Sequence, residues 1–287
     1  MSVSFVYPNV AEFYKKVKPR GGLLERWRLA KKLYCGYIEV PADFIKNKTE
    51  VAKTGLKMGD FLDEQAIERL YRKDAHLPND VKYILHTEYE SSHKSLLKWE
   101  VPEWRKRFVN MVISISKYFG LPAKAIEIHP GYQRSTFKDI IEAIIALLTE
   151  YSQTFNVKPV ILIENRTKQL ISNGTEILHF WEYLSVNYPE LKSVVGITID
   201  IPQLFTQTGE KFEEELEKIP IEAVKGLHIH SNSHFKVPSI EDKIPWKKVF
   251  EKITQIKNDL ILNPEVNHKN IVKETIIFCK KMLAHAY

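Results

Sequence analysis

Val160-Ile161-Leu162-Ile163-Glu164 is a short apolar run that ends on a carboxylate, and it is one of six comparable runs in the last two-thirds of the chain. A buried strand is expected to be apolar throughout, because burying a carboxylate or an imidazole costs free energy unless a partner meets it. The other five runs also end on a residue that can bind a metal: Tyr83–His86, Ala125–His129, Gly196–Asp200, Val224–His228 and Leu260–Glu265. Six such endings predict parallel strands that deliver metal ligands to one shared point.

Helical periodicity fills the segments between these runs. Two more strand patterns occur at Ser4–Tyr7 and Tyr37–Val40, and the last strand is predicted over Leu260–Val266. The helical patterns are Leu23–Leu33, Phe61–Arg72, Glu103–Tyr118, Phe137–Tyr151, Glu176–Val186, Lys211–Lys218, Trp246–Ile256 and Ile271–Leu283. Eight strands that alternate with helices indicate parallel pairing through right-handed crossovers. The predicted fold is therefore α/β, a single (β/α)8 TIM barrel of residues 1–287, with a doubly wound open sheet as the alternative. In such barrels the site lies at the C-terminal ends of the strands, where all six candidate ligands fall.

The composition is that of an ordinary globular protein, with 44% hydrophobic and 27% charged residues. Cys35 and Cys279 are too few to form a disulfide framework or a zinc ribbon. The chain starts without a signal-like segment and has no run as long as a membrane span, which predicts a cytoplasmic protein without membrane contact. A net charge of +6 permits a polyanionic partner such as DNA, although the Lys residues are spread along the chain.

The candidate ligands are carboxylates and imidazoles, which suit zinc, manganese, iron or cobalt, and no sulfur ligand accompanies them. One ion would be held by four residues, Glu164, Asp200, His228 and Glu265. His86 and His129 would hold a second ion, with Glu164 as the bridge. Each residue alone has an ordinary structural explanation (Glu164, for instance, could pair with Arg166), and the coincidence of the whole set favours the metal. We therefore predict one or two divalent ions, zinc or else manganese or cobalt. Two ions about 4 Å apart suit displacement at a phosphodiester.

At these residues the chain resembles the xylose isomerase-like barrel superfamily, which contains endonuclease IV, the UV-damage endonucleases and the sugar isomerases and epimerases. The resemblance is clearest over Tyr83–Glu265. In that superfamily a glutamate, an aspartate, a histidine and a glutamate from the last four strands bind metal. The residues that stand in those places, in the same order, are Glu164, Asp200, His228 and Glu265. The resemblance implies the same four-ligand set here.

Other segments resemble the nuclease branch. Ile128-His129-Pro130-Gly131-Tyr132-Gln133 is similar to the His-Pro-Gly turn of endonuclease IV and the UV-damage endonucleases, in which the histidine binds metal. By this resemblance Tyr132 and Gln133 would contact an unstacked nucleotide. His86 falls where endonuclease IV has another metal histidine. Gln203 departs from the pattern, because it stands where that family has a zinc-binding histidine, and this departure favours one or two ions over three.

One segment resembles the sugar enzymes instead. His228–His234, followed by Ile244-Pro245-Trp246, is similar to the seventh-strand region of ketose epimerases. A glutamate and an arginine of that family's motif are replaced here by Ser231 and His234, so the substrate contacts of those two residues do not carry over. Gln203, His230 and His234 are nevertheless predicted to lie against the substrate.

Two functions fit this pattern. The first is a metal-dependent phosphodiesterase of the endonuclease IV type that acts on damaged or abasic DNA, with Glu164 and Glu265 as catalytic groups that assist proton transfer. The alternative is a metal-dependent sugar isomerase or epimerase, in which the same two glutamates would move a proton beside a sugar chelated to one ion. His86, the His129-Pro130-Gly131 turn and the positive net charge favour the first. DNA is therefore the predicted partner, and a small sugar is the alternative.

Overall fold

Eight parallel strands close into a barrel in the order in which they occur along the chain. The computed structural model describes residues 2–10, 20–87, 97–132 and 134–285. The strands are β1 (Val3–Tyr7), β2 (Tyr37–Pro41), β3 (Tyr83–Thr87), β4 (Ala125–Ile128), β5 (Val160–Glu164), β6 (Val195–Asp200), β7 (Val224–His228) and β8 (Leu260–Asn263). Each strand pairs in parallel with its neighbours, and β1 pairs with β8 to close the ring. The predicted (β/α)8 barrel is confirmed.

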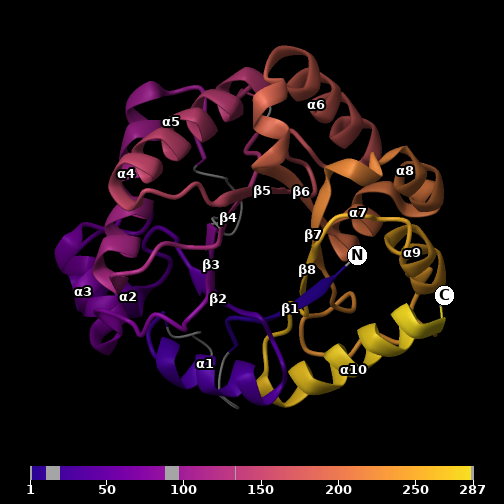
Figure 1. Cartoon of the computed structure of the whole chain (residues 1–287), viewed down its shortest axis with the longest axis horizontal. Coiled ribbons are helices and arrows are strands. Elements are labelled where there is room, and N and C mark those ends of the chain that lie inside the picture. Colours follow the sequence, from indigo (N-terminus) through magenta and orange to yellow (C-terminus); the bar gives the residue numbers. More distant parts are fainter. Residues whose placement is uncertain (1, 11–19, 88–96, 133, 286–287) are drawn as a thin grey trace.

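Helices surround this ring of strands on the outside (Figure 1). They are α1 (Leu23–Lys32), α2 (Lys48–Thr54), α3 (Glu64–Tyr71), α4 (Pro102–Phe119), α5 (Phe137–Phe155), α6 (Gly174–Asn187), α7 (Ile201–Thr208), α8 (Phe212–Lys218), α9 (Trp246–Ile253) and α10 (Lys269–His285). Two of them, α2 and α7, were not predicted. Helix α7 begins directly after the last residue of β6, and Pro202 fits its first turn because no backbone N–H is needed there. Within the described part of the chain, none of the helices combines the length and apolar character required to span a bilayer.

The interior of the barrel is apolar in one layer and polar in the next. The apolar layer is a buried cluster of Val6, Ile84, Ala125 and Leu162. Side chains alternate between the two faces of a strand, so the next inward-facing positions lie two residues further on. On β3, β4 and β5 these positions are His86, Glu127 and Glu164. The larger apolar core is separate and includes residues of both the strands and the surrounding helices. The polar layer therefore lies inside the barrel, toward the C-terminal ends of the strands.

Two of the predicted strands end earlier than expected. Strand β8 ends at Asn263 rather than at Val266, and Pro264 follows, which cannot donate to a strand ladder. Glu265 then folds back, with its N–H donating to the carbonyl of Asn263 at 2.9 Å. Strand β4 ends at Ile128, so His129 also lies just past its strand. These two candidate ligands, His129 and Glu265, therefore lie at the start of the loops that follow their strands.

Candidate metal centre

Most of the predicted site residues meet at the C-terminal end of the barrel. They come from six different strands or the loops that directly follow them. All are buried except His234, whose side chain is 33% exposed. The residues that meet there are His86, His129, Glu164, Asp200, His228, His230, His234 and Glu265. The structure thus brings these residues together at one end of the barrel, and their roles as ligands stay predictions.

Glu164 is the centre of the deeper part of this site. Its Oε2 lies 3.1 Å from His86 Nε2 and 3.1 Å from His129 Nε2. The same oxygen lies 3.6 Å from His228 Nδ1. The Nε2 atoms of His86 and His129 are themselves 3.4 Å apart. Three imidazoles from β3, β7 and the loop after β4 therefore face one carboxylate oxygen.

Glu265 connects this group to the outer part of the site. Its Oε2 lies 3.4 Å from His228 Nδ1, 3.8 Å from His230 Nε2 and 3.9 Å from His234 Nδ1. His230 Nε2 also lies 3.6 Å from an Asp200 oxygen, Oδ1. The rings of His230 and His234 stack, with centroids 3.9 Å apart. Because His234 is partly exposed, this second group extends from the buried cluster toward solvent.

The spacing of these atoms fits a bound cation. Nitrogen and oxygen ligands that are each about 2.0–2.2 Å from an ion lie about 3–4 Å from one another. Distances of 3.4–3.9 Å around Glu265 are too long for ordinary hydrogen bonds but match ligands that share an ion. Several of the atoms are buried without a hydrogen bond to any described residue: His228 Nδ1, His230 Nε2, Asp200 Oδ2 and Glu265 Oε2. This set of oxygens and imidazole nitrogens suits a divalent transition-metal ion.

The electrostatics of the cluster keep its carboxylates ionised. Burial by itself raises the pKa of Glu164 and of Glu265, but the neighbouring histidines, His228 among them, outweigh it and hold both pKa values well below the usual range. Burial lowers the pKa of His86 and His228, but the charges of Glu127 and Glu164 raise both well above the usual value. The carboxylates are therefore anions, the form that binds a cation.

Glu39 and Glu127 belong to the same cluster, and the sequence analysis missed both. Glu127 Oε1 lies 2.7 Å from His228 Nε2, and Glu39 Oε1 lies 2.9 Å from His86 Nδ1. Both side chains are buried. They lie within strands, whereas the predicted ligands lie at strand ends. The signal that identifies them is a charged residue inside an otherwise apolar strand, and Glu127 precedes His129 by two residues, so it shares its face.

Asp200 is held in place by three neighbours. Its N–H donates to Asn165 Oδ1 at 2.8 Å, and Asn165 Nδ2 donates to its carbonyl at 3.3 Å. Its Oδ1 accepts the N–H of Gln203 at 2.9 Å and so caps helix α7. Arg166 Nη1 lies 3.9 Å from Asp200 Oδ2 and 3.5 Å from Glu164 Oε1. The buried guanidinium thus adds one positive charge between two of the candidate ligands.

The remaining predicted substrate residues lie outside this cluster or are not described. The Gln203 amide oxygen accepts the Thr167 hydroxyl at 2.6 Å, so this side chain is joined to the loop after β5. Tyr132 lies in the loop after β4 and is 36% exposed. Gln133 lies outside the described residues. The predicted substrate contacts of these residues stay predictions.

The His-Pro-Gly turn has a structural role that explains its glycine. Gly131 has a φ of 75°, in the left-handed region that glycine adopts without strain. A Cβ at this position would lie 3.0 Å from Cδ1 of the buried Trp99. Trp99 Nε1 donates to the carbonyl of His129 at 3.1 Å. The glycine therefore lets the turn pack against the tryptophan that holds His129 in place.

Comparison with known proteins identifies the fold. No model of a known protein family matches the sequence, and no curated protein matches it. Among solved structures, a D-tagatose 3-epimerase-like protein is 16% identical, with a TM-score of 0.60 over 99% of this chain and 98% of its own. A xylose isomerase domain protein from Alicyclobacillus acidocaldarius is 13% identical, with a TM-score of 0.55 over 99% of both chains. The fold is that of the xylose isomerase-like TIM barrels. Endonuclease IV from Thermus thermophilus is similar as well, at 13% identity and a TM-score of 0.54 over 99% of this chain and 100% of its own. Neighbours of this fold thus include both a sugar epimerase-like protein and an endonuclease, and identities this low establish the fold rather than the activity.

Proposed function

We propose that the chain is a metal-dependent phosphodiesterase of the endonuclease IV type that cleaves damaged or abasic DNA. The observation that carries the proposal is the pair of histidines on Glu164. His86 Nε2 and His129 Nε2 both lie 3.1 Å from Glu164 Oε2, beside the separate group of ligands around Glu265. Two adjacent ligand groups joined by one carboxylate suit two divalent ions, the arrangement that clamps both oxygens of a phosphodiester displacement.

Each residue of the site has a role in this proposal. His86, His129 and Glu164 would hold one ion, and the other would be held by Glu164, Asp200, His228 and Glu265. The bound ions would supply Lewis-acid stabilisation of the phosphate oxygens and would lower the pKa of a water molecule. Arg166 adds a fixed positive charge for a phosphate oxygen. Glu265 would take the proton that the water molecule loses.

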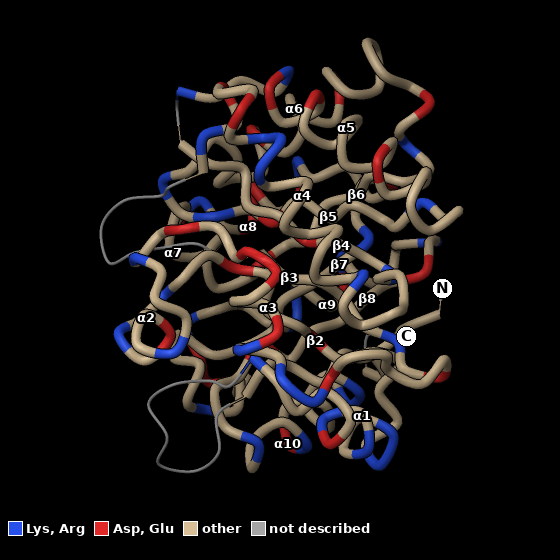
Figure 2. The backbone as a smooth tube through the Cα atoms, turned by 90° about the vertical axis from the view of Figure 1, so that its left-hand side faces the viewer, with Lys and Arg blue, Asp and Glu red and all other residues tan. Residues whose placement is uncertain are grey.

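The surface charge does not by itself identify a nucleic-acid partner. In Figure 2, Lys and Arg are interspersed with Asp and Glu over the visible side, without one continuous basic stripe among the described residues. The net charge of +6 favours association with a polyanion in a general way. The DNA proposal therefore rests on the chemistry of the metal centre rather than on a basic groove.

The test is cleavage of a duplex that contains a single abasic site. Purified protein loaded with zinc, manganese or cobalt is expected to nick the strand at that site and to contain two ions per chain. The variant His129→Asn is expected to lose one ion and to lose nicking. His179→Asn is the matched control, because His179 lies on the outer helix α6, away from the metal centre. It is expected to keep both the ions and the activity.

A metal-loaded protein that leaves the abasic duplex intact would refute the proposal. Binding of the same duplex provides a second check. Phosphate contacts release counterions, so the logarithm of the binding constant should fall linearly with the logarithm of the salt concentration. A binding constant that does not change with salt would show that the protein makes no phosphate contacts.

A sugar isomerase or epimerase is the second candidate, and one observation favours it. Oxygens of Glu164 and Glu265 lie 3.6 Å and 3.4 Å from the same nitrogen, His228 Nδ1. Two carboxylates this close to one ligand position suit proton transfer on either side of a substrate chelated to a single ion. The D-tagatose 3-epimerase-like neighbour points in the same direction. Solvent deuterium incorporation into a ketose, with one ion per chain and no nicking, would establish this function and exclude the nuclease.

A further inference from the structure

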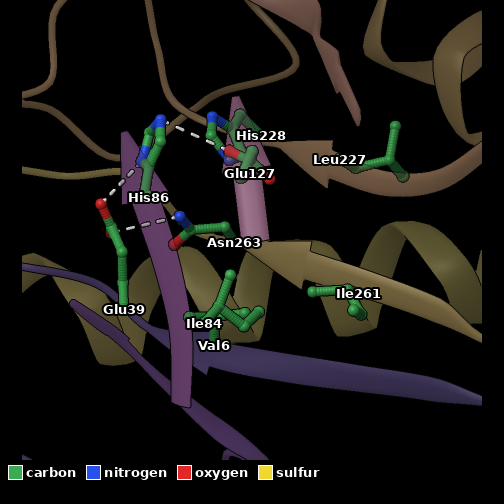
Figure 3. Close-up of a pocket in the computed structure, with 9 residues that line it drawn as sticks. All are labelled: Val6, Glu39, Ile84, His86, Glu127, Leu227, His228, Ile261 and Asn263. Carbon is green, nitrogen blue, oxygen red and sulfur yellow. Dashed lines mark hydrogen bonds and ion pairs between the residues drawn. The ribbon is translucent and has the colours of Figure 1, made fainter. Parts of the chain in front are cut away.

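Two histidines of the metal centre use opposite ring nitrogens to contact a buried carboxylate. His86 places Nδ1 2.9 Å from Glu39 Oε1 and turns Nε2 toward Glu164. His228 places Nε2 2.7 Å from Glu127 Oε1 and turns Nδ1 toward Glu164 and Glu265. Figure 3 shows both carboxylates on the same inner layer of the barrel as the two imidazoles. An imidazole nitrogen this close to a carboxylate oxygen faces it with its N–H. His86 Nε2 is also within hydrogen-bond distance of Glu164, so a bound ion would replace the hydrogen on Nε2 while Nδ1 keeps its own toward Glu39.

The Glu127 carboxylate is itself fixed by a neighbouring strand. Its Oε2 accepts the hydroxyl of Thr198, on β6, at 2.8 Å. Gly226, on β7, leaves the space that this threonine fills, because a Cβ at that glycine would lie 2.3 Å from Thr198 Oγ1. The position of the carboxylate under His228 is therefore determined by the barrel and not by the imidazole alone.

The Glu39 carboxylate is fixed in the same way by residues from two other parts of the chain. Its Oε2 accepts the backbone N–H of Asn9 at 3.0 Å and Nδ2 of Asn263 at 3.2 Å. Its other oxygen is the one that faces His86. Glu39 is thus held by partners in the barrel and in the loop after β1, and its orientation is set before any ion binds.

Both carboxylates line a small cavity between the polar layer and the apolar layer beneath it. Its lining includes Glu39, Glu127 and the two imidazoles above Val6, Ile84 and Ile261 (Figure 3). The cavity measures about 10 Å³, close to the lower limit for a single water molecule. Water therefore screens these contacts weakly, and each carboxylate–imidazole interaction is correspondingly strong.

We propose that Glu39 and Glu127 are positioning residues that fix the tautomers of His86 and His228, so that His86 binds an ion through Nε2 and His228 through Nδ1. This inference rests on the metal centre of the proposed function. It goes beyond that function because it gives a role to two glutamates outside the proposed ligand set, and Glu127 lies close enough to His86, Glu164 and His228 for direct binding of the ion to be the competing explanation. An imidazole that donates to a carboxylate is held in one orientation and becomes a more basic ligand, and loss of such a partner typically costs 10–100-fold in metal affinity.

Glu127 gives the sharper test, because two substitutions separate its charge from its hydrogen bond. Glu127→Gln keeps an oxygen that can face His228 Nε2, and its amide N–H can donate to the Thr198 hydroxyl. It therefore removes the charge with little rearrangement. Glu127→Leu removes the charge and the acceptor together. In cobalt titrations followed by visible absorption, we expect affinity to fall about 10-fold in Glu127→Gln and about 100-fold in Glu127→Leu.

The matched control is Glu50→Gln. Glu50 is another buried glutamate, paired with Arg20 at 2.8 Å, and neither residue contacts the metal centre. Its loss should lower stability to urea without changing cobalt affinity or the absorption spectrum of bound cobalt. In contrast, the spectrum should change in Glu127→Leu, because His228 is then free to bind through either nitrogen. Urea unfolding of each variant confirms that the protein measured is folded.

The possible failures can be told apart. If the unsubstituted protein binds no cobalt, both the metal centre and the proposed function are wrong. If it binds cobalt and both Glu127 variants bind it with unchanged affinity and spectrum, the positioning inference is wrong and the proposed function stands. If the variants lose affinity as expected while the unsubstituted protein cleaves no abasic duplex, the positioning inference stands and the nuclease proposal is wrong.

Discussion

Replacing Gly226 by alanine tests the packing that supports the inner polar layer. The new Cβ would lie 2.3 Å from Thr198 Oγ1 and 3.1 Å from Thr198 Cβ. The first distance is a severe overlap, so the hydroxyl must rotate away from Glu127 Oε2, which it now contacts at 2.8 Å. Overpacking of a well-packed core costs about 1–3 kcal/mol. The lost hydrogen bond to a buried carboxylate adds about 1.5–3 kcal/mol. We expect Gly226→Ala to lower the free energy of unfolding by about 2.5–6 kcal/mol, the sum of these two ranges.

A double-mutant cycle measured by urea unfolding gives the coupling free energy between Gly226 and Thr198. Thr198→Ala removes the hydroxyl, so a Cβ added at Gly226 then meets only the methyl carbon and backbone at position 198. The cost of Gly226→Ala should therefore be smaller in the Thr198→Ala background than in the unsubstituted protein, with a coupling of about 0.5–3 kcal/mol, the range for residues in contact. An equal cost in both backgrounds would refute the claim that these two residues are packed against each other. The control Gly209→Ala adds a Cβ that meets nothing within 4 Å and reports the cost of backbone strain alone, because Gly209 has a φ of 54°.

Three further predictions concern stability. Glu50→Gln should cost about 3–5 kcal/mol at pH 7, because the buried Arg20 loses its charged partner. Burial raises the pKa of Glu50, but the hydrogen bonds and charge of Arg20 outweigh it and lower the pKa, so this stability is present at neutral pH and is lost as the pH falls through that pKa. The urea midpoints of the unsubstituted protein and of the Glu50→Gln variant should become equal in acid. A difference between the two midpoints that does not change with pH would contradict this. Trp99→Phe should cost at least about 0.5–1.5 kcal/mol by removing the indole donor to His129, and an unchanged midpoint would show that the contact is not stabilising. Removing metal with a chelator should lower the melting temperature, since an ion at 100 times its Kd stabilises the fold by about 2.7 kcal/mol, and an unchanged melting temperature would contradict a bound ion.

The sequence was informative about the barrel because of its periodicity. Apolar runs that alternate with helical patterns required parallel strands, and the expected order of eight units is the observed one. The ends of elements were less predictable. Strand β8 stops at Asn263 because Pro264 follows, and α7 starts at Ile201, where no helix was predicted. Local proline chemistry is compatible with several backbone paths, and tertiary packing selects one of them.

The candidate ligands of the metal centre were predictable from the sequence, and the residues that support them were not. His86, His129 and Glu164 stand out because a polar residue ends an apolar strand. Glu39 and Glu127 lie in the middle of strands, where a single charge resembles an ordinary exposed position. Only the closed barrel shows that both face inward, where the register places His86 opposite Glu127. The tautomer of each histidine likewise depends on contacts between strands distant in sequence, which periodicity does not encode.

The most direct test of the account is the location of metal in crystals of the zinc- or cobalt-loaded protein, by anomalous scattering at the absorption edge of the ion. A centre of two ions should give two peaks that share Glu164, with His86 bound through Nε2 and His228 through Nδ1. Glu39 and Glu127 should touch neither peak. A single peak, a peak coordinated by Glu39 or Glu127, or binding through the other nitrogen of either histidine would contradict it.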